Sequence, residues 1–204
     1  MSLTRRKFIQ STSASLIFSG MTAWMNGCQR KIEKPNILLI MADDMGFSDL
    51  GCYGSEINTP HIDRLAYEGL RFTQFYNAAR CCPTRASLLT GLYPHQVGMG
   101  GMVAKSEGQK PEGAYQGYLN KHCVTIPEVL KEEGYTTLMS GKWHVGEFQP
   151  AWPLDRGFDR YWGLISGAAN YFNVTKTKNH KPIRTMAEDN EAIPLPTENF
   201  YMTN

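Results

Sequence analysis

The sequence has almost no excess of charge of either sign. Its 204 residues include 21 Lys and Arg against 19 Asp and Glu, which gives a formal net charge of +2 at pH 7. Domains that bind nucleic acid usually gather Lys and Arg on one face or along one segment. The balance therefore argues against a nucleic-acid partner, and charge by itself indicates no other partner.

The sequence also lacks a long apolar segment. Its weakly apolar stretch from Ala14 to Trp24 contains several Ser and Thr residues, and a membrane-spanning helix needs about 20 apolar residues. The preceding Arg5-Arg6 pair resembles a twin-arginine export signal, and Met25-Asn26-Gly27-Cys28 resembles a lipoprotein cleavage box whose Cys28 would be lipidated. We therefore expect residues 1–30 to be a signal peptide, read by the export machinery of a bacterium, and the remainder to be periplasmic or a membrane-anchored lipoprotein.

Cysteine is scarce, with five in the chain, at positions 28, 52, 81, 82 and 123. If Cys28 carries lipid and Cys81 is chemically modified, three remain, so a complete disulfide framework is not implied. The adjacent pair Cys81-Cys82 fits no common zinc spacing, because neighbouring side chains diverge and no second Cys-x-x-Cys follows. The cysteines therefore predict neither a disulfide scaffold nor a zinc site.

Apolar strands alternate with helices after the leader. The continuous apolar run Asn36 to Met41 is typical of a strand buried on both faces of a parallel sheet. Further strands are expected at Leu70 to Tyr76 and Tyr135 to Met139. Capping residues and helix breakers predict three helices, from Thr59-Pro60 to Gly69, from Pro83 to near Gly91, and from Thr125 to Gly134. The pattern predicts an α/β fold with a largely parallel central sheet flanked by helices. It is incomplete at the C-terminus, where residues 199–204 read like the start of another element.

Two adjacent carboxylates, Asp43 and Asp44, follow the first expected strand. Ligands of open α/β sheets bind beyond the carboxyl ends of the strands. Adjacent carboxylates repel each other unless a cation neutralises them, and oxygen ligands suit Ca²⁺ or Mg²⁺. The pair is a candidate site for a hard divalent metal, although an Asp-Asp pair also occurs simply as the cap of a turn.

The run Cys81-Cys82-Pro83-Thr84-Arg85, continued by Leu89-Thr90-Gly91, is the most specific pattern in the chain. It resembles the signature of the type I sulfatases, members of the alkaline phosphatase superfamily. Three further blocks resemble that family in the same order: Pro35-Asn36-Ile37 leading to Asp43-Asp44, Thr59-Pro60-His61-Ile62-Asp63-Arg64-Leu65, and Gly141-Lys142-Trp143-His144-Val145-Gly146. The resemblance covers Lys34 to about Gly167 and identifies residues 31–204 as the N-terminal part of a sulfatase catalytic domain.

The resemblance implies a sulfuric ester hydrolase acting on aryl or carbohydrate sulfates. Cys81 would be converted to formylglycine by a separate maturing enzyme, and its hydrated aldehyde would attack sulfur with one hydroxyl and expel sulfate with the other. Arg85 would hold that diol, Lys142 would contact sulfate, and His144 would hydrogen-bond the diol and take its proton. Ca²⁺ or Mg²⁺ would be bound by Asp43, Asp44 and the modified residue 81.

Two alternatives to a complete sulfatase remain open. Hydrolysis of phosphate or phosphonate monoesters is one, since the same kind of site can accept phosphorus. A non-catalytic lipoprotein fragment is the other, because the family completes its metal site with a downstream Asp-Asn pair and adds a further His and Lys at the sulfate. None of these is identified here, and Asp189-Asn190 is not assigned. We therefore expect the 204-residue chain to be inactive by itself.

Overall fold

The computed structural model describes residues 34–172, 174, 177–178, 181–182, 184–194 and 200–202. The chain divides into two units, residues 1–42 and residues 43–204. The expected signal peptide, with Cys28, lies outside the described residues. Among those that are described, no helix has the length and apolar character needed to cross a membrane.

The described part of the first unit corrects one prediction. Residues 34–42 form no strand, and the apolar side chains of Ile37, Leu38, Leu39 and Ile40 are exposed. The expected strand buried on both faces is therefore not observed. An apolar run supplies side chains for burial, but a strand exists only where a neighbouring backbone pairs with it.

The described residues of the second unit include three α-helices, as the capping residues predict. They are α2 (Pro60–Glu68), α3 (Cys81–Thr90) and α4 (Ile126–Glu132), and short 3₁₀ turns occur at η1 (Phe47–Asp49), η2 (Gly51–Tyr53) and η3 (Leu154–Arg156). The capping box of α4 is confirmed, because the Thr125 hydroxyl accepts from the Glu128 N–H and the Glu128 carboxylate accepts from the Thr125 N–H. Helix α3 begins at Cys81, two residues before the predicted start at Pro83, and ends at Gly91 in the left-handed conformation.

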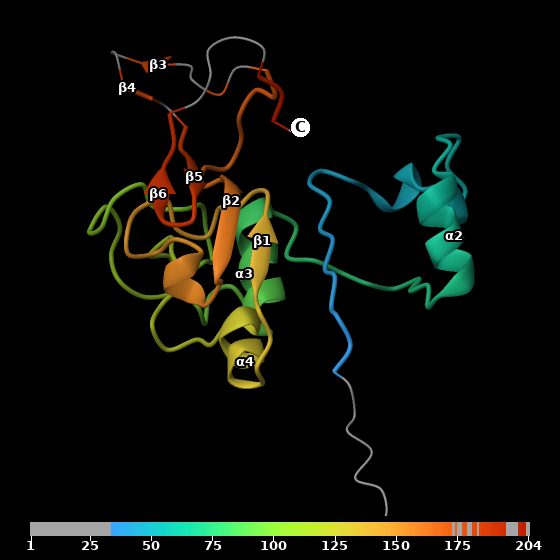
Figure 1. Ribbon diagram of the computed structural model, residues 1–204, viewed down its shortest axis with the longest axis horizontal. Helices are drawn as coiled ribbons and strands as arrows, with labels where there is room; N and C mark the ends of the chain where they lie inside the picture. The colour runs from blue at the N-terminus through green and yellow to red at the C-terminus, as the bar shows by residue number, and fades with distance from the viewer. Residues whose placement is uncertain are drawn as a thin grey trace, which may run out of the picture. The chain divides into compact units, whose positions relative to one another are not determined.

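The sheet is mixed rather than largely parallel. Its order is β1 (Leu138–Ser140), β2 (Arg160–Leu164), β5 (Met186–Glu188) and β6 (Glu191–Ala192), and a separate pair joins β3 (Thr177–Lys178) to β4 (Lys181–Pro182). Strand β2 pairs parallel to β1 and antiparallel to β5, which pairs antiparallel to β6 (Figure 1). The strand expected at residues 70–76 is absent, and the one expected at 135–139 is displaced to β1. Strand propensity depends on available partners, which local sequence does not specify.

The core joins the start of α3 to the segments that follow β1 and β2. Buried residues of this core include Cys82 and Ala86 on α3, Trp143 and Val145 after β1, and Ile165 after β2. The backbone of these last segments stays paired beyond the strands, since the N–H groups of Trp143 and His144 donate to the carbonyls of Leu164 and Ile165. The block from residue 141 to 146 is therefore held against the first turn of α3.

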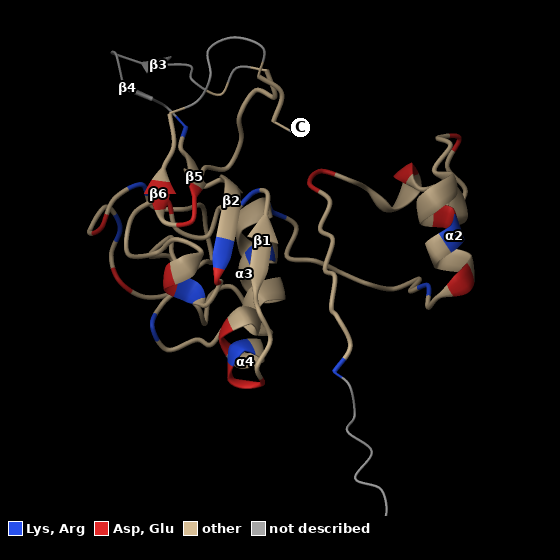
Figure 2. Cartoon of the chain, viewed as in Figure 1, with Lys and Arg blue, Asp and Glu red and all other residues tan. Residues whose placement is uncertain are grey.

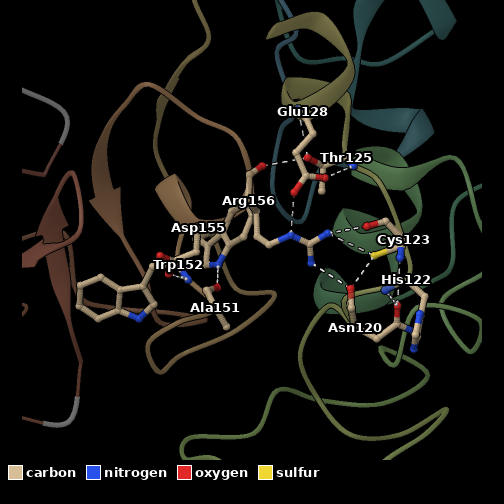
Figure 3. A network of polar contacts seen from close by, with 10 residues as sticks. Asn120, His122, Cys123, Thr125, Glu128, Ala151, Trp152, Asp155 and Arg156 are labelled. Carbon is tan, nitrogen blue, oxygen red and sulfur yellow. Dashed lines mark hydrogen bonds and ion pairs between the residues drawn. The ribbon is translucent and has the colours of Figure 1, made fainter. Parts of the chain in front are cut away.

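A buried arginine joins η3 to α4 and the loop before it (Figure 3). Arg156 donates from Nε to Glu128 at 3.2 Å, from Nη1 to the Asn120 carbonyl at 3.3 Å and from Nη2 to the Cys123 carbonyl at 2.8 Å. The Thr125 hydroxyl donates to the Arg156 carbonyl at 2.8 Å. Every nitrogen of this guanidinium therefore has an acceptor, which is what burial of a charged group requires.

Candidate functional site

The first turn of α3 presents two thiols with different surroundings. Cys81 is the first residue of the helix and is partly exposed, whereas Cys82 is fully buried. Burial is the largest influence on Cys82 and raises the pKa of its thiol to about 12. The unpaired N–H groups at a helix start favour an anion there. Cys81 is therefore the thiol that solvent and a negatively charged ligand can reach.

Arg85 lies one turn further along α3 and reaches the block that follows β1. Its Nη1 donates to the Lys142 carbonyl at 2.5 Å, and its Nη2 lies 3.5 Å from Asp43 Oδ1. Its Nε is buried and has no hydrogen-bond partner. A buried donor without an acceptor is costly and uncommon, so an added acceptor at Arg85 Nε would be stabilising.

Lys142 converges on the same carboxylate. Its Nζ lies 2.6 Å from Asp43 Oδ2, and the Asp43 side chain is 41% exposed. Partial burial alone would raise the pKa of Asp43, but the hydrogen bond and charge of Lys142, together with Arg85, outweigh it and hold that pKa below its usual value. The structure thus brings together three of the predicted residues, because Arg85 and Lys142 both contact the partly exposed carboxylate of Asp43.

His144 lies on the other side of the first turn of α3. Its side chain is buried, its backbone is left-handed with φ of 58°, and its Nδ1 and Nε2 lie 3.5 and 3.4 Å from Cys82 Sγ. Burial, followed by the charges of Lys142 and Arg85, lowers the pKa of His144 to about 4. The imidazole is therefore neutral near pH 7 and can accept a proton.

Two residues that the sequence did not single out frame His144. A β-carbon on Gly167 would lie 2.1 Å from His144 Nε2, so the ring occupies the space of that missing side chain. Glu147 Oε1 accepts from the Gly167 N–H at 3.2 Å and lies 3.8 Å from His144 Nε2. Burial raises the pKa of Glu147. No local pattern identifies either residue, because Gly167 meets His144 only through the pairing of the two segments.

The predicted metal ligands are not assembled into a site. Asp43 already faces two cations, and Asp44 sits in a left-handed backbone position with φ of 54°. In the described part of the chain, the one group of three or more His, Cys, Asp or Glu with metal-binding spacing contains neither aspartate. Two carboxylates are fewer than the six or more oxygen ligands that a hard divalent cation takes, so Asp43 and Asp44 stay predicted ligands. Asp189 and Asn190 do not supply the missing ligands, because they bind Arg160 and Asp155 instead.

Basic and acidic residues elsewhere are interspersed. Figure 2 shows both signs along α4 and the adjacent sheet rather than one basic tract. Arg85 and Lys142 differ from this pattern in that two cations share one carboxylate, Asp43.

Comparison with known proteins agrees with this geometry. The sulfatase family matches residues 35–198. An uncharacterized sulfatase of Schizosaccharomyces pombe is 40% identical over 197 residues, covering 86% of this chain and 34% of that protein. The arylsulfatase of Klebsiella aerogenes is 38% identical, covering 83% of this chain and 36% of its own length.

Solved structures give the same result. Ps i-CgsB, crystallised in complex with k-i-k-neocarrahexaose, is 33% identical with a TM-score of 0.69, covering 84% of this chain and 39% of that one. The chain thus spans about a third of the length of the curated relatives named here. Its second unit has a sulfatase-like fold, and the chain belongs to the sulfatase family.

Proposed function

We propose that this chain is the N-terminal catalytic part of an enzyme that hydrolyses sulfate esters. The observation that carries the proposal is that Arg85, one helical turn after Cys81 on α3, and Lys142 converge on Asp43, with a buried Arg85 Nε that lacks an acceptor. A sulfate group supplies oxygens that accept from several fixed donors at once. Membership of the sulfatase family supports the same reaction.

Cys81 is the residue that we propose is converted to formylglycine. It is the partly exposed thiol of the pair and it lies at the start of α3, while Cys82 is fully buried. The hydrated aldehyde would supply a nucleophile that can later release sulfate, where a serine would keep it as a stable ester. A separate maturing enzyme is then a required partner.

The surrounding side chains have distinct proposed roles. Arg85, one turn after residue 81 on α3, holds the reacting group through its guanidinium, which also contacts the Lys142 carbonyl and Asp43. Lys142 neutralises the sulfate oxygens. His144 is neutral because burial and the nearby cations lower its pKa to about 4, so a ring nitrogen is free to accept a hydrogen bond from the diol of residue 81. Glu147 and Gly167 keep its ring in place.

We propose that Asp43 and Asp44, with modified residue 81, contribute oxygens to Ca²⁺ or Mg²⁺ only when ligands from outside this chain are present. The carboxylates described here are too few and are partly neutralised by Arg85 and Lys142. Hard divalent cations take six or more oxygen ligands. The roles proposed for Arg85, Lys142 and His144 do not depend on this ion.

The proposed substrate is an aryl sulfate or a sulfated carbohydrate. Arylsulfatases are among the relatives, and Ps i-CgsB was crystallised with an oligosaccharide. Bacterial export to the periplasm, with lipidation at Cys28, is proposed from the leader sequence alone.

Mass spectrometry of the peptide containing residue 81, from protein made in its own host, tests the central step. Conversion of the thiol to an aldehyde leaves a characteristic loss of mass. In a protein extended to the length of its relatives, Cys81→Ser should abolish turnover, while the same exchange at Cys52, another free cysteine, should not. An unaltered thiol with full turnover would contradict the proposal.

Two further experiments test the preference for sulfate over phosphate esters and the activity of the 204-residue chain by itself. Sulfate and phosphate esters of one leaving group should be compared on a protein extended to the length of its relatives, and preference for phosphate would favour the phosphomonoesterase alternative. The 204-residue chain alone should leave an aryl sulfate intact.

A further inference from the structure

Two thiols and an imidazole meet at the first turn of α3. The Sγ atoms of Cys81 and Cys82 and a ring nitrogen of His144 all lie within 4.8 Å of one another. Both ring nitrogens of His144 lie 3.4 to 3.5 Å from Cys82 Sγ. The cysteines are adjacent, yet the helix start does not separate their sulfurs as the sequence predicted. This corrects the expectation that the two cysteine side chains diverge.

The distance from Cys82 Sγ to the ring nitrogens of His144 is that of two ligands of one tetrahedral zinc. Zinc binds thiolate sulfur at about 2.3 Å and imidazole nitrogen at about 2.0–2.1 Å, so a tetrahedral angle separates sulfur and nitrogen by about 3.5 Å. Thiolate and imidazole are also the donors that zinc prefers, whereas Ca²⁺ and Mg²⁺ prefer oxygen. The cluster is therefore chemically distinct from the site expected at Asp43 and Asp44.

We propose that the folded chain, while residue 81 is still cysteine, binds one Zn²⁺ through Cys81, Cys82 and His144. Each thiol releases its proton to solvent as its sulfur takes the cation, and two thiolates neutralise the dication. Cys81 is partly exposed, so water can complete the tetrahedron from the solvent side. The nearly equal distances place Cys82 Sγ over the ring of His144 rather than along one nitrogen, so the Cys82 side chain must rotate to share a cation with that nitrogen.

The charges around the cluster are compatible with this ligand set. Lys142 and Arg85 act on His144 from the segment after β1 and from α3, and Asp43 offsets both of them. Burial raises the pKa of the Cys82 thiol, so the cation itself must displace the proton of that thiol.

The inference goes beyond the proposed function and concerns a different chemical state of the same turn. Conversion of Cys81 to an aldehyde removes one thiolate, so the zinc site belongs to the unconverted chain alone. Bound zinc would distinguish folded molecules in which Cys81 was not converted, and it would protect that thiol from alkylation.

The test uses the full chain made in a host without the maturing enzyme, reduced and freed of metal, and titrated with Co²⁺ and then Zn²⁺. We expect one Co²⁺ per chain with thiolate-to-cobalt charge-transfer absorption, which Zn²⁺ then removes. Zn²⁺ should also protect Cys81 from alkylation. Cys82→Ser should weaken Co²⁺ binding by more than about tenfold, and Cys52→Ser and Cys123→Ser should leave it unchanged.

Each outcome decides between the two proposals. Absence of the charge-transfer band, or an unchanged band in Cys82→Ser, would overturn the zinc site and leave the sulfatase proposal standing. Alkylation of Cys81 at an unchanged rate in Zn²⁺ would overturn it without any variant. Conversely, zinc binding by the thiol form together with a host protein that is active without conversion would overturn formylglycine and leave the zinc site standing.

Discussion

Arg85 and Arg156 are equally buried, each 8% exposed, but their surroundings differ. Each nitrogen of Arg156 donates to a fixed acceptor of the chain. Arg85 uses Nη1 and Nη2 but leaves a buried Nε without an acceptor. Its carboxylate partner, Asp43, is shared with Lys142 and is 41% exposed.

The difference separates an arginine whose donors are all satisfied within the fold from one that we propose binds a ligand. Burial of a charge is tolerated when every donor is satisfied, which makes Arg156 a structural link between η3 and α4. A guanidinium with a buried donor that lacks an acceptor lowers the stability of the fold. Beside the partly exposed Asp43, the same guanidinium can bind an anion. Exposure alone would not have distinguished the two residues.

Exchange of each arginine for lysine should give the sharpest contrast. Arg85→Lys removes the planar donor set at the reacting group, so turnover should fall by about 10³-fold, about 4 kcal/mol. Arg156→Lys should instead lower the unfolding free energy. We would measure turnover in a formylglycine-bearing protein extended to the length of its relatives. Denaturant unfolding of both variants would measure their stability. Equal turnover in the two variants would remove the distinction.

Removal of the Arg156 charge should destabilise the chain by about 3 kcal/mol, because Glu128 and two buried carbonyls lose their donor. Arg156→Met keeps much of the side-chain volume and isolates this effect. Arg160→Met is the control, since Arg160 is 65% exposed in its pairs with Glu188 and Asp189 and should cost less than about 1 kcal/mol. Urea unfolding distinguishes them, and similar losses would show that Arg156 is no special link.

On the Arg85 side of the comparison, we expect the ring of His144 to be held in place by its packing against Gly167. Gly167→Ala places a β-carbon 2.1 Å from His144 Nε2, so the ring must shift and the unfolding free energy should fall by about 2 kcal/mol. Gly101→Ala is the control, because its nearest contact would be an ordinary 3.5 Å to Tyr115. Thermal unfolding compares the pair, and a neutral Gly167→Ala would mean that His144 is not fixed by this contact.

The smallest effect concerns the acidic partner of Arg156. Burial alone would raise the pKa of Glu128, but the Thr125 N–H and Arg156 hold it below its usual 4.5. The unfolded state therefore takes up a proton first, and this stabilisation, less than about 1 kcal/mol, is present above pH 4.5 and lost as pH falls below it. Glu128→Gln should flatten the stability profile between pH 5 and 3, and exposed Glu132→Gln should not. Superimposable profiles for wild type and Glu128→Gln would contradict this.

Local sequence by itself determined the three helices and the family of the chain. Thr125 with Glu128, Pro60 and Gly91 act on their own helix ends, so their effects are readable without tertiary structure. The blocks around Cys81 and Lys142 are equally local, and they identify the sulfatase family that residues 35–198 match. The predicted metal ligands Asp43 and Asp44 stay a prediction.

Only the tertiary structure decided how strands pair and which side chains meet. Apolar residues 36–41 and 70–76 read as strands but have none, because pairing depends on segments far away in the chain. Gly167 against His144, the free Nε of Arg85, and both thiols of Cys81-Cys82 beside one imidazole likewise arise where separate segments pack together. Short-range patterns record local conformational preferences, whereas a site is made of distances between residues that the sequence leaves unrelated.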